Sequence, residues 1–142
     1  MTTYATAISI DAGQEAVWRV LSAVTEWPAW LSTVSRVEPL DGALLALGAR
    51  YRVVQPKLRP GIWKVTVLDA PRRYAWEARW PGLQATGDHV VERTAPERSR
   101  VTLSIAFSGL LGTLVGRLSR EITLRYLDQE AASLKAKVER HA

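Results

Sequence analysis

Hydrophobic and polar residues alternate in four segments of the chain. The segments are residues 50–55, 62–68, 74–80 and 100–108. In the first of them, Tyr51, Val53 and Gln55 share one side, and arginines occupy the other. Successive side chains of a strand point to opposite faces of a sheet. The pattern therefore predicts antiparallel strands with one buried face and one solvent-facing side, joined by turns that contain proline or glycine.

The first forty residues predict a strand, two short helices and another strand. Residues 4–10 alternate and are rich in Thr and Ile, which is typical of a strand. Asp11 is the expected N-cap of a helix that carries Glu15 in its first turn. Residues 25–31 predict a second, short helix, and residues 34–40 predict a strand that ends at a turn.

Residues 83–93 predict a strand whose inward side carries little bulk. The inward positions are Leu83, Ala85, Gly87, His89 and Val91. Small side chains and one imidazole stand where large apolar side chains would normally fill a core. We interpret this strand as one wall of a cavity.

The end of the chain, from about residue 109 to residue 140, predicts one long helix without proline. Its apolar residues form two stripes that differ by roughly half a turn. One stripe contains Leu111, Leu114, Val115, Leu118, Ile122 and Tyr126, and the other contains Leu124, Leu127, Ala131, Leu134 and Val138. The first half must therefore face a different partner from the second, or the helix must be kinked near residues 119–123. We expect the second half to close a core and the first half, which Gly112 and Gly116 weaken, to cover the cavity.

Composition narrows the class of protein. A chain of 142 residues is expected to form one domain, residues 1–142, with a core that needs no crosslinks. The absence of cysteine excludes disulfides, thiolate catalysis and Cys-ligated zinc, and is consistent with a cytoplasmic location. The N-terminus lacks the pattern of a signal peptide, and no apolar run is long enough to span a bilayer.

The charge pattern does not indicate nucleic-acid binding. Lys and Arg number 19 against 14 Asp and Glu, a net charge of +5, but the basic residues occur as pairs spread over several predicted strands. A nucleic-acid site usually concentrates its positive charge on one element. A preference for anionic ligands or membrane surfaces remains compatible with this charge.

The order of these elements resembles the START-like (Bet v 1-like) superfamily, and within it the bacterial polyketide cyclase/dehydrase-type SRPBCC proteins. The resemblance rests on residues 8–18, Trp27-Pro28-Ala29-Trp30, residues 101–103 leading to 108–112, and residues 127–138. It implies an α+β helix-grip fold. In that fold, an antiparallel sheet of about six or seven strands wraps around a long C-terminal helix and encloses a hydrophobic cavity, with two short helices after the first strand. Members of the superfamily bind lipids, sterols, polyketides or quinones, and a minority catalyse cyclisation. No catalytic motif carries over.

Aromatic residues and one histidine are the candidate site residues. Six tryptophans can be explained by core packing, since each buries ~150–250 Å², and we assign Trp18 and Trp27 to the core. We expect the cavity to be lined by Trp30, Tyr51, Val53, Trp63, Trp76, Trp80, His89, Phe107, Leu114 and Leu118. His89 is either a hydrogen-bonded structural residue or a general base with Tyr51 as its polar partner, whereas His141 lies in the predicted tail.

The expected function is binding of a small hydrophobic ligand, such as a lipid, a polyketide or another aromatic metabolite. One alternative is an enzyme of the polyketide cyclase or aromatase type that uses His89. A second is an interaction module resembling the Hsp90-activator branch of the superfamily, which predicts an exposed apolar patch. No cofactor, metal or nucleotide site is expected, and the chain is expected to be a monomer or homodimer without integral membrane contact.

Overall fold

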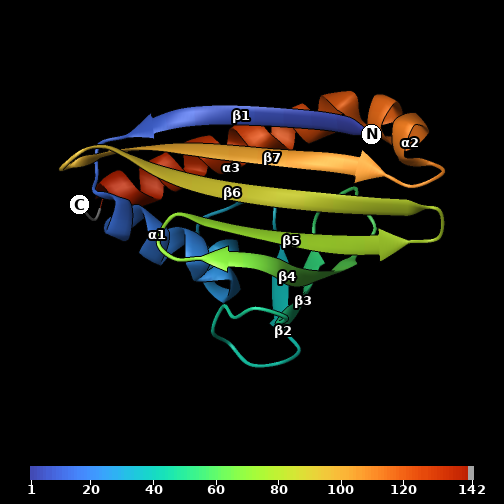
Figure 1. Ribbon diagram of the computed structural model, residues 1–142, viewed down its shortest axis with the longest axis horizontal. Helices are drawn as coiled ribbons and strands as arrows, with labels where there is room; N and C mark the ends of the chain where they lie inside the picture. The colour runs from blue at the N-terminus through green and yellow to red at the C-terminus, as the bar shows by residue number, and fades with distance from the viewer. Residues whose placement is uncertain (141–142) are drawn as a thin grey trace.

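The computed structural model describes residues 1–140 and contains a seven-stranded antiparallel sheet and a long C-terminal helix (Figure 1). His141 lies outside the described residues. The strands are β1 (Thr2–Ile10), β2 (Arg36–Pro39), β3 (Arg50–Val54), β4 (Gly61–Asp69), β5 (Arg73–Trp80), β6 (Leu83–Ala95) and β7 (Arg98–Ser108). Their order in the sheet is β1-β7-β6-β5-β4-β3-β2. The predicted helix-grip fold is confirmed.

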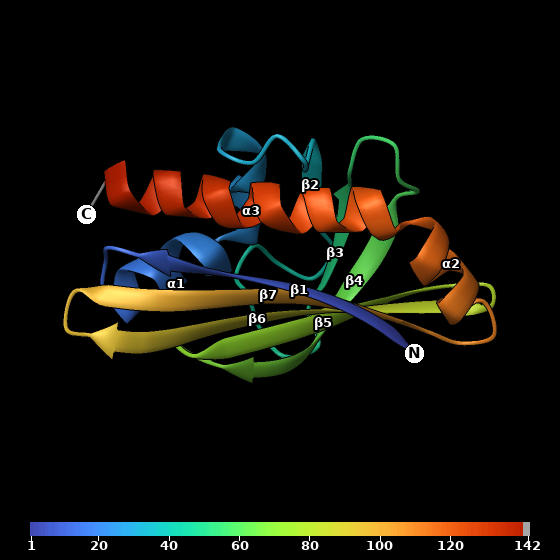
Figure 2. The ribbon, with the colours of Figure 1, turned by 90° about the horizontal axis from the view of Figure 1, so that it is seen from above.

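Alternation in the sequence becomes alternation of burial in the sheet. In β3, Tyr51 and Val53 are buried between exposed arginines. In β4, Trp63 and Val65 are buried, whereas Lys64 is exposed. The sheet curves strongly, so that β3 and β4 rise beside the C-terminal helix while β1 and β7 run beneath it (Figure 2). Apart from Ala75 of β5, the buried side chains of β3 to β7 therefore face one concave side.

Two short helical segments follow β1, as predicted. These are α1 (Gln14–Ser22) and the 3-10 helix η1 (Val24–Ala29). The prediction of Asp11 as the N-cap of α1 was wrong, because Gly13 occupies that position without a side-chain cap. The Asp11 carboxylate instead accepts a hydrogen bond from Arg98 at the β6–β7 turn.

The C-terminal segment forms two helices, α2 (Gly112–Leu118) and α3 (Arg120–Arg140), instead of one. The break at Ser119 lies within residues 119–123, where a kink was one of the two alternatives predicted from the apolar stripes. Each glycine of α2 sits against the sheet: a Cβ on Gly116 would lie 2.8 Å from Thr2 Cβ, and one on Gly112 would lie 3.1 Å from the Phe107 carbonyl. Because α2 packs on the end of β1 and β7, it takes a different direction from α3 (Figure 2).

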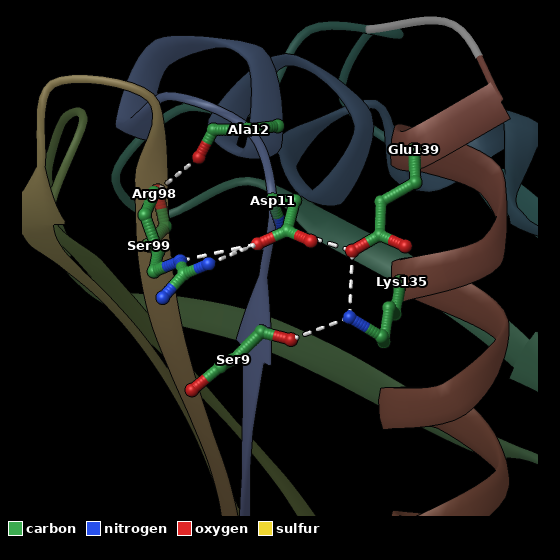
Figure 3. A network of polar contacts seen from close by, with 7 residues as sticks. All are labelled: Ser9, Asp11, Ala12, Arg98, Ser99, Lys135 and Glu139. Atoms are coloured by element: carbon green, nitrogen blue, oxygen red, sulfur yellow. Dashed lines mark hydrogen bonds and ion pairs between the residues drawn. The ribbon is translucent and has the colours of Figure 1, made fainter.

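The C-terminal half of α3 is fastened to the sheet by apolar and polar contacts. Ala131, Leu134 and Val138 are buried. Beside them, Lys135 Nζ donates to the Ser9 carbonyl at 2.9 Å and pairs with Glu139 at 2.6 Å (Figure 3).

A second part of this network joins the end of β1 to its neighbours. Glu139 accepts the backbone N–H of Asp11, and Ser99 Oγ donates to the Ala12 carbonyl at 2.8 Å. These bonds tie α3, the end of β1 and the β6–β7 turn together at one end of the molecule (Figure 3).

Candidate ligand-binding cavity

A cavity of about 520 Å³ lies between the sheet and the first half of α3. Its sheet side is formed by inward residues of β3 to β7, and its helix side by Thr123, Leu127 and Glu130 of α3. Exposed residues of three segments also line it: Leu58 and Arg59 of the β3–β4 loop, Pro81 of the β5–β6 turn and Leu111 before α2. The cavity therefore opens at the end of the molecule opposite the polar network of Figure 3.

The small residues of β6 create the space. Ala85 and Gly87 are buried and line the cavity together with His89. A Cβ on Gly87 would lie 3.0 Å from Trp76 Nε1 and 3.7 Å from Trp63 Cζ3. The first distance is tighter than an ordinary contact, so glycine lets the Trp76 indole lie this close to the strand, whereas the second is an ordinary van der Waals contact. The interpretation of β6 as a cavity wall agrees with this geometry.

Tryptophans form a continuous aromatic wall along the cavity. The ring of Trp76 lies 5.5 Å from that of Trp27 and 5.7 Å from that of Trp63, which in turn lies 6.3 Å from Trp80. Tilted and edge-on contacts at these distances are favourable for aromatic pairs. Each ring of this wall is held by contacts with its neighbours.

The indole N–H groups of this wall differ in their partners. Trp27 Nε1 donates to the Leu21 carbonyl and Trp80 Nε1 to the Pro60 carbonyl. Trp63 Nε1 and Trp76 Nε1 have no hydrogen-bond partner within residues 1–140. Because buried indole N–H groups are usually paired, these two donors remain available to a bound molecule.

His89 is a buried, neutral imidazole with one free nitrogen. Its ring stacks on that of Tyr74 at 4.1 Å, and Nδ1 lies 3.1 Å from the Tyr74 carbonyl oxygen. A carbonyl only accepts, so Nδ1 carries the proton and Nε2 keeps its lone pair. Burial lowers the pKa of His89 to about 4, although the Tyr74 carbonyl and the Asp88 carboxylate favour the charged form. Nε2 has no partner in the described part of the chain.

Glu130 is the functional candidate that sequence reasoning missed. It is half-buried on α3, lines the cavity and has neither a hydrogen bond nor an ion pair among the residues described. Desolvation raises the pKa of its carboxyl to about 7. The sequence feature that could have identified Glu130 is its position. It lies three residues after Leu127 and four before Leu134, which places it on the apolar face of the helix.

The structure brings six of the predicted lining residues together and leaves four outside. Val53, Trp63, Trp76, Trp80, His89 and Phe107 line the cavity. Trp30 packs behind Trp27, at 6.2 Å between rings. Tyr51 is fully buried beneath Trp76, and its hydroxyl donates to the Leu44 carbonyl.

Leu114 and Leu118 were also expected to face the cavity, but they are 57% and 79% exposed. Their placement by helical periodicity was wrong, because α2 turns away at Ser119. Its cavity side is instead formed by Val115.

The described residues contain no group of three or more His, Cys, Asp or Glu side chains arranged to hold a metal ion. Within residues 1–140, no helix is long and apolar enough to cross a membrane. In the described part of the chain, the unpaired polar groups that line the cavity include two indole donors, the imidazole acceptor, the Glu130 carboxyl and, nearer its mouth, the side chains of Gln55 and Arg59.

Comparison with known proteins agrees with this architecture. The model of the family described as polyketide cyclase/dehydrase and lipid transport matches residues 1–139. A search of curated proteins found no significant match.

Three solved structures illustrate the similarity of fold. A hypothetical protein from Helicobacter pylori is 14% identical, with a TM-score of 0.82 over 96% of this chain and 87% of its own. The Zhui aromatase/cyclase from a Streptomyces species is 17% identical, with a TM-score of 0.79 over 97% and 93%. Norcoclaurine synthase from Thalictrum flavum, in complex with dopamine and hydroxybenzaldehyde, is 14% identical, with a TM-score of 0.78 over 99% and 87%.

Proposed function

The chain belongs to the polyketide cyclase/dehydrase and lipid transport family, and on that premise we propose that it binds a small, largely apolar aromatic molecule in the cavity between the sheet and α3. The observation that carries the proposal is the cavity itself. Its volume of about 520 Å³ lies within the range of roughly 300–1,000 Å³ typical of small-molecule sites. A closely packed core would contain no such space.

The walls favour a flat ligand with a few polar groups. The tryptophan wall offers a broad aromatic surface, against which a planar ring system can stack. The free N–H groups of Trp63 and Trp76 require acceptors, such as carbonyl or phenol oxygens. Nε2 of His89 requires a donor. A hydroxylated aromatic molecule satisfies these three atoms together, whereas a saturated fatty chain satisfies none.

Native mass spectrometry of the freshly purified protein tests the proposal directly. We expect an adduct of a few hundred daltons, which denaturing extraction then identifies. Binding is measured separately by titration with aminoanthracene, a neutral three-ring fluorescent probe. Thr123→Phe should fill part of the cavity from the α3 side and weaken probe binding at least tenfold.

The matched control is Thr94→Phe, which adds the same ring at an exposed position of β6. Equal probe affinity for the two variants, or no probe binding by the wild-type protein, would contradict the proposal. Thermal unfolding of both variants verifies that each one is folded.

A second candidate function, ring closure of a poly-β-ketone, is favoured by the pair of ionisable groups in the cavity. Glu130 has its pKa raised to about 7 and His89 has its pKa lowered to about 4. Such opposite displacements in one site are typical of acid–base catalysis. With a pKa near neutrality, Glu130 is better suited than His89 to remove a proton from carbon.

This second candidate has its own test. A synthetic poly-β-ketone should cyclise faster with the wild-type protein than in buffer alone. Glu130→Gln should lower kcat at least a hundredfold while leaving aminoanthracene affinity unchanged at pH 6. Rates equal to buffer would exclude cyclisation and leave the binding proposal intact.

A further inference from the structure

Exposed leucines gather at the open end of the cavity. Leu110 is 97% exposed, Leu118 79% and Leu114 57%, and all three lie on α2 or just before it. Leu58 of the β3–β4 loop and Leu111 before α2 are also exposed, and both line the cavity. We call these five side chains the leucine rim. Exposed large apolar side chains are ordinary when scattered, but a contiguous group marks a site of interaction.

The cations around the leucine rim have no acidic partners. Lys57, Arg59, Arg117 and Arg120 are all exposed and form no ion pair among the described residues. The ion pairs of the described chain lie elsewhere, for example Arg73 with Asp88 and Lys135 with Glu139. The four unpaired cations outnumber the exposed carboxylate of Glu121 beside Arg120, so positive charge is in excess at the end of the molecule that also exposes the leucines.

The spacing on α2 places both kinds of side chain on one outward face. Leu114 and Leu118 are four residues apart on α2, and Arg117 lies three residues after Leu114, whereas Leu110 is exposed in the turn that precedes the helix. The opposite face of α2 carries Gly112 and Gly116, which lie against the sheet. Apolar side chains beside arginines on one face are the pattern of segments that lie at a membrane surface.

We propose that the leucine rim docks on an anionic lipid bilayer, with the mouth of the cavity facing the membrane. The leucines would enter the boundary between headgroups and acyl chains, while the four cations contact acidic headgroups. An apolar ligand could then pass between bilayer and cavity without crossing water. The docking is inferred from the leucine rim and its cations alone. Only the transfer of a ligand depends on the proposed function.

The position of the rim supports this orientation. It lies at the end of the molecule where α2 projects, away from the polar network that fastens the other end of α3 (Figure 2). In addition, Tyr126 of α3 donates its hydroxyl to the Pro56 carbonyl in the β3–β4 loop. That bond holds the loop carrying Leu58 against α3, the helix that directly follows α2.

Co-sedimentation with vesicles tests the docking. The vesicles are phosphatidylcholine alone, or phosphatidylcholine with one third phosphatidylglycerol. We expect the wild-type protein to bind the anionic vesicles at least tenfold more tightly, with an affinity that falls as salt increases. Leu114→Ser combined with Leu118→Ser, and separately Arg117→Glu, should each lower the partition coefficient roughly tenfold or more.

Leu44→Ser combined with Leu47→Ser is the matched control. These leucines are 86% and 69% exposed but lie in the β2–β3 loop, away from α2 (Figure 1), so vesicle binding should not change. The Thr123→Phe variant separates the two proposals, because it should lose aminoanthracene binding and keep vesicle binding.

Four results would overturn the docking. The first is no binding to anionic vesicles by the folded wild-type protein, and the second is equal loss in the rim and control variants. The third is a homodimer in analytical ultracentrifugation that dissociates when Leu114 and Leu118 are replaced, which would show that a second copy covers the rim. A stable complex with another protein that occupies the rim, without vesicle binding, would likewise contradict it.

Discussion

Replacing Glu130 by Gln should stabilise the protein at alkaline pH and have little effect at acidic pH. The carboxyl has an ordinary pKa of 4.5 and a folded-state value of about 7, because the cavity removes it from water without supplying a partner. At about 1.4 kcal/mol per pKa unit, this difference corresponds to at most ~3.4 kcal/mol. Since Glu130 is only half-buried, we expect about 1.5–2 kcal/mol.

The sign follows from proton binding in the two states. Between pH 4.5 and about pH 7, the folded protein holds a proton on Glu130 that the unfolded chain has released. The free energy of unfolding is therefore highest below pH 4.5 and decreases as the pH rises through 7. Glutamine, which stays neutral, removes this decrease.

His89 makes the free energy of unfolding increase with pH, opposite to Glu130, over nearly the same pH range. Its pKa is lowered from 6.5 to about 4, so the unfolded chain holds a proton there that the folded protein lacks. This contribution is fully present above pH 6.5 and is lost as the pH falls through 4. In the wild-type protein, the decrease in the free energy of unfolding with pH that Glu130 causes and the increase that His89 causes offset each other between pH 4.5 and 6.5. In Glu130→Gln the slope of His89 should appear alone.

Urea unfolding followed by tryptophan fluorescence at pH 4.5, 5.5, 6.5 and 8 measures this effect. The stability of Glu130→Gln should rise with pH relative to the wild-type protein, and the difference should be complete at pH 8. The matched control is Glu121→Gln, an exposed glutamate in the first turn of α3, which should cost less than about 1 kcal/mol through the lost interaction with the helix N-terminus and should show no change between pH 6.5 and 8. A difference between Glu130→Gln and wild type that is constant with pH would refute the reasoning.

Further predictions concern packing and buried hydrogen bonds, and urea unfolding measures each of them. Gly87→Ala places a methyl group about 3.0 Å from Trp76 Nε1 and should cost ~1–3 kcal/mol while weakening aminoanthracene binding. Ser99→Ala removes a fully buried hydroxyl that donates to the Ala12 carbonyl and should cost ~1–2 kcal/mol, whereas Ser32→Ala, at an exposed position, should be neutral. Tyr74→Phe should cost only ~0.5–1.5 kcal/mol, because the Leu21 carbonyl keeps its bond from the Trp27 indole.

The strands and their buried faces could be predicted because a strand has a period of two. Once Tyr51, Trp63 and Trp76 are assigned to one face of their strands, no distant contact can move them to the other without shifting the register. The same rule identified β6 as a wall with little bulk, where Gly87 and His89 now line the cavity. These features depend on neighbours in the sequence.

The chemistry of the cavity and the outer surface of α2 depended on contacts between distant segments. Leu114 and Leu118 lie on an apolar stripe, but which side of a helix is buried depends on the surface it packs against, and α2 packs on Thr2 and Phe107 through its glycines. Tyr51 faces inward, but its hydroxyl already donates a hydrogen bond to a backbone carbonyl seven residues earlier in the chain. Glu130 acquires its raised pKa only where α3 crosses the sheet, because desolvation is set by the surrounding side chains and not by the residue itself.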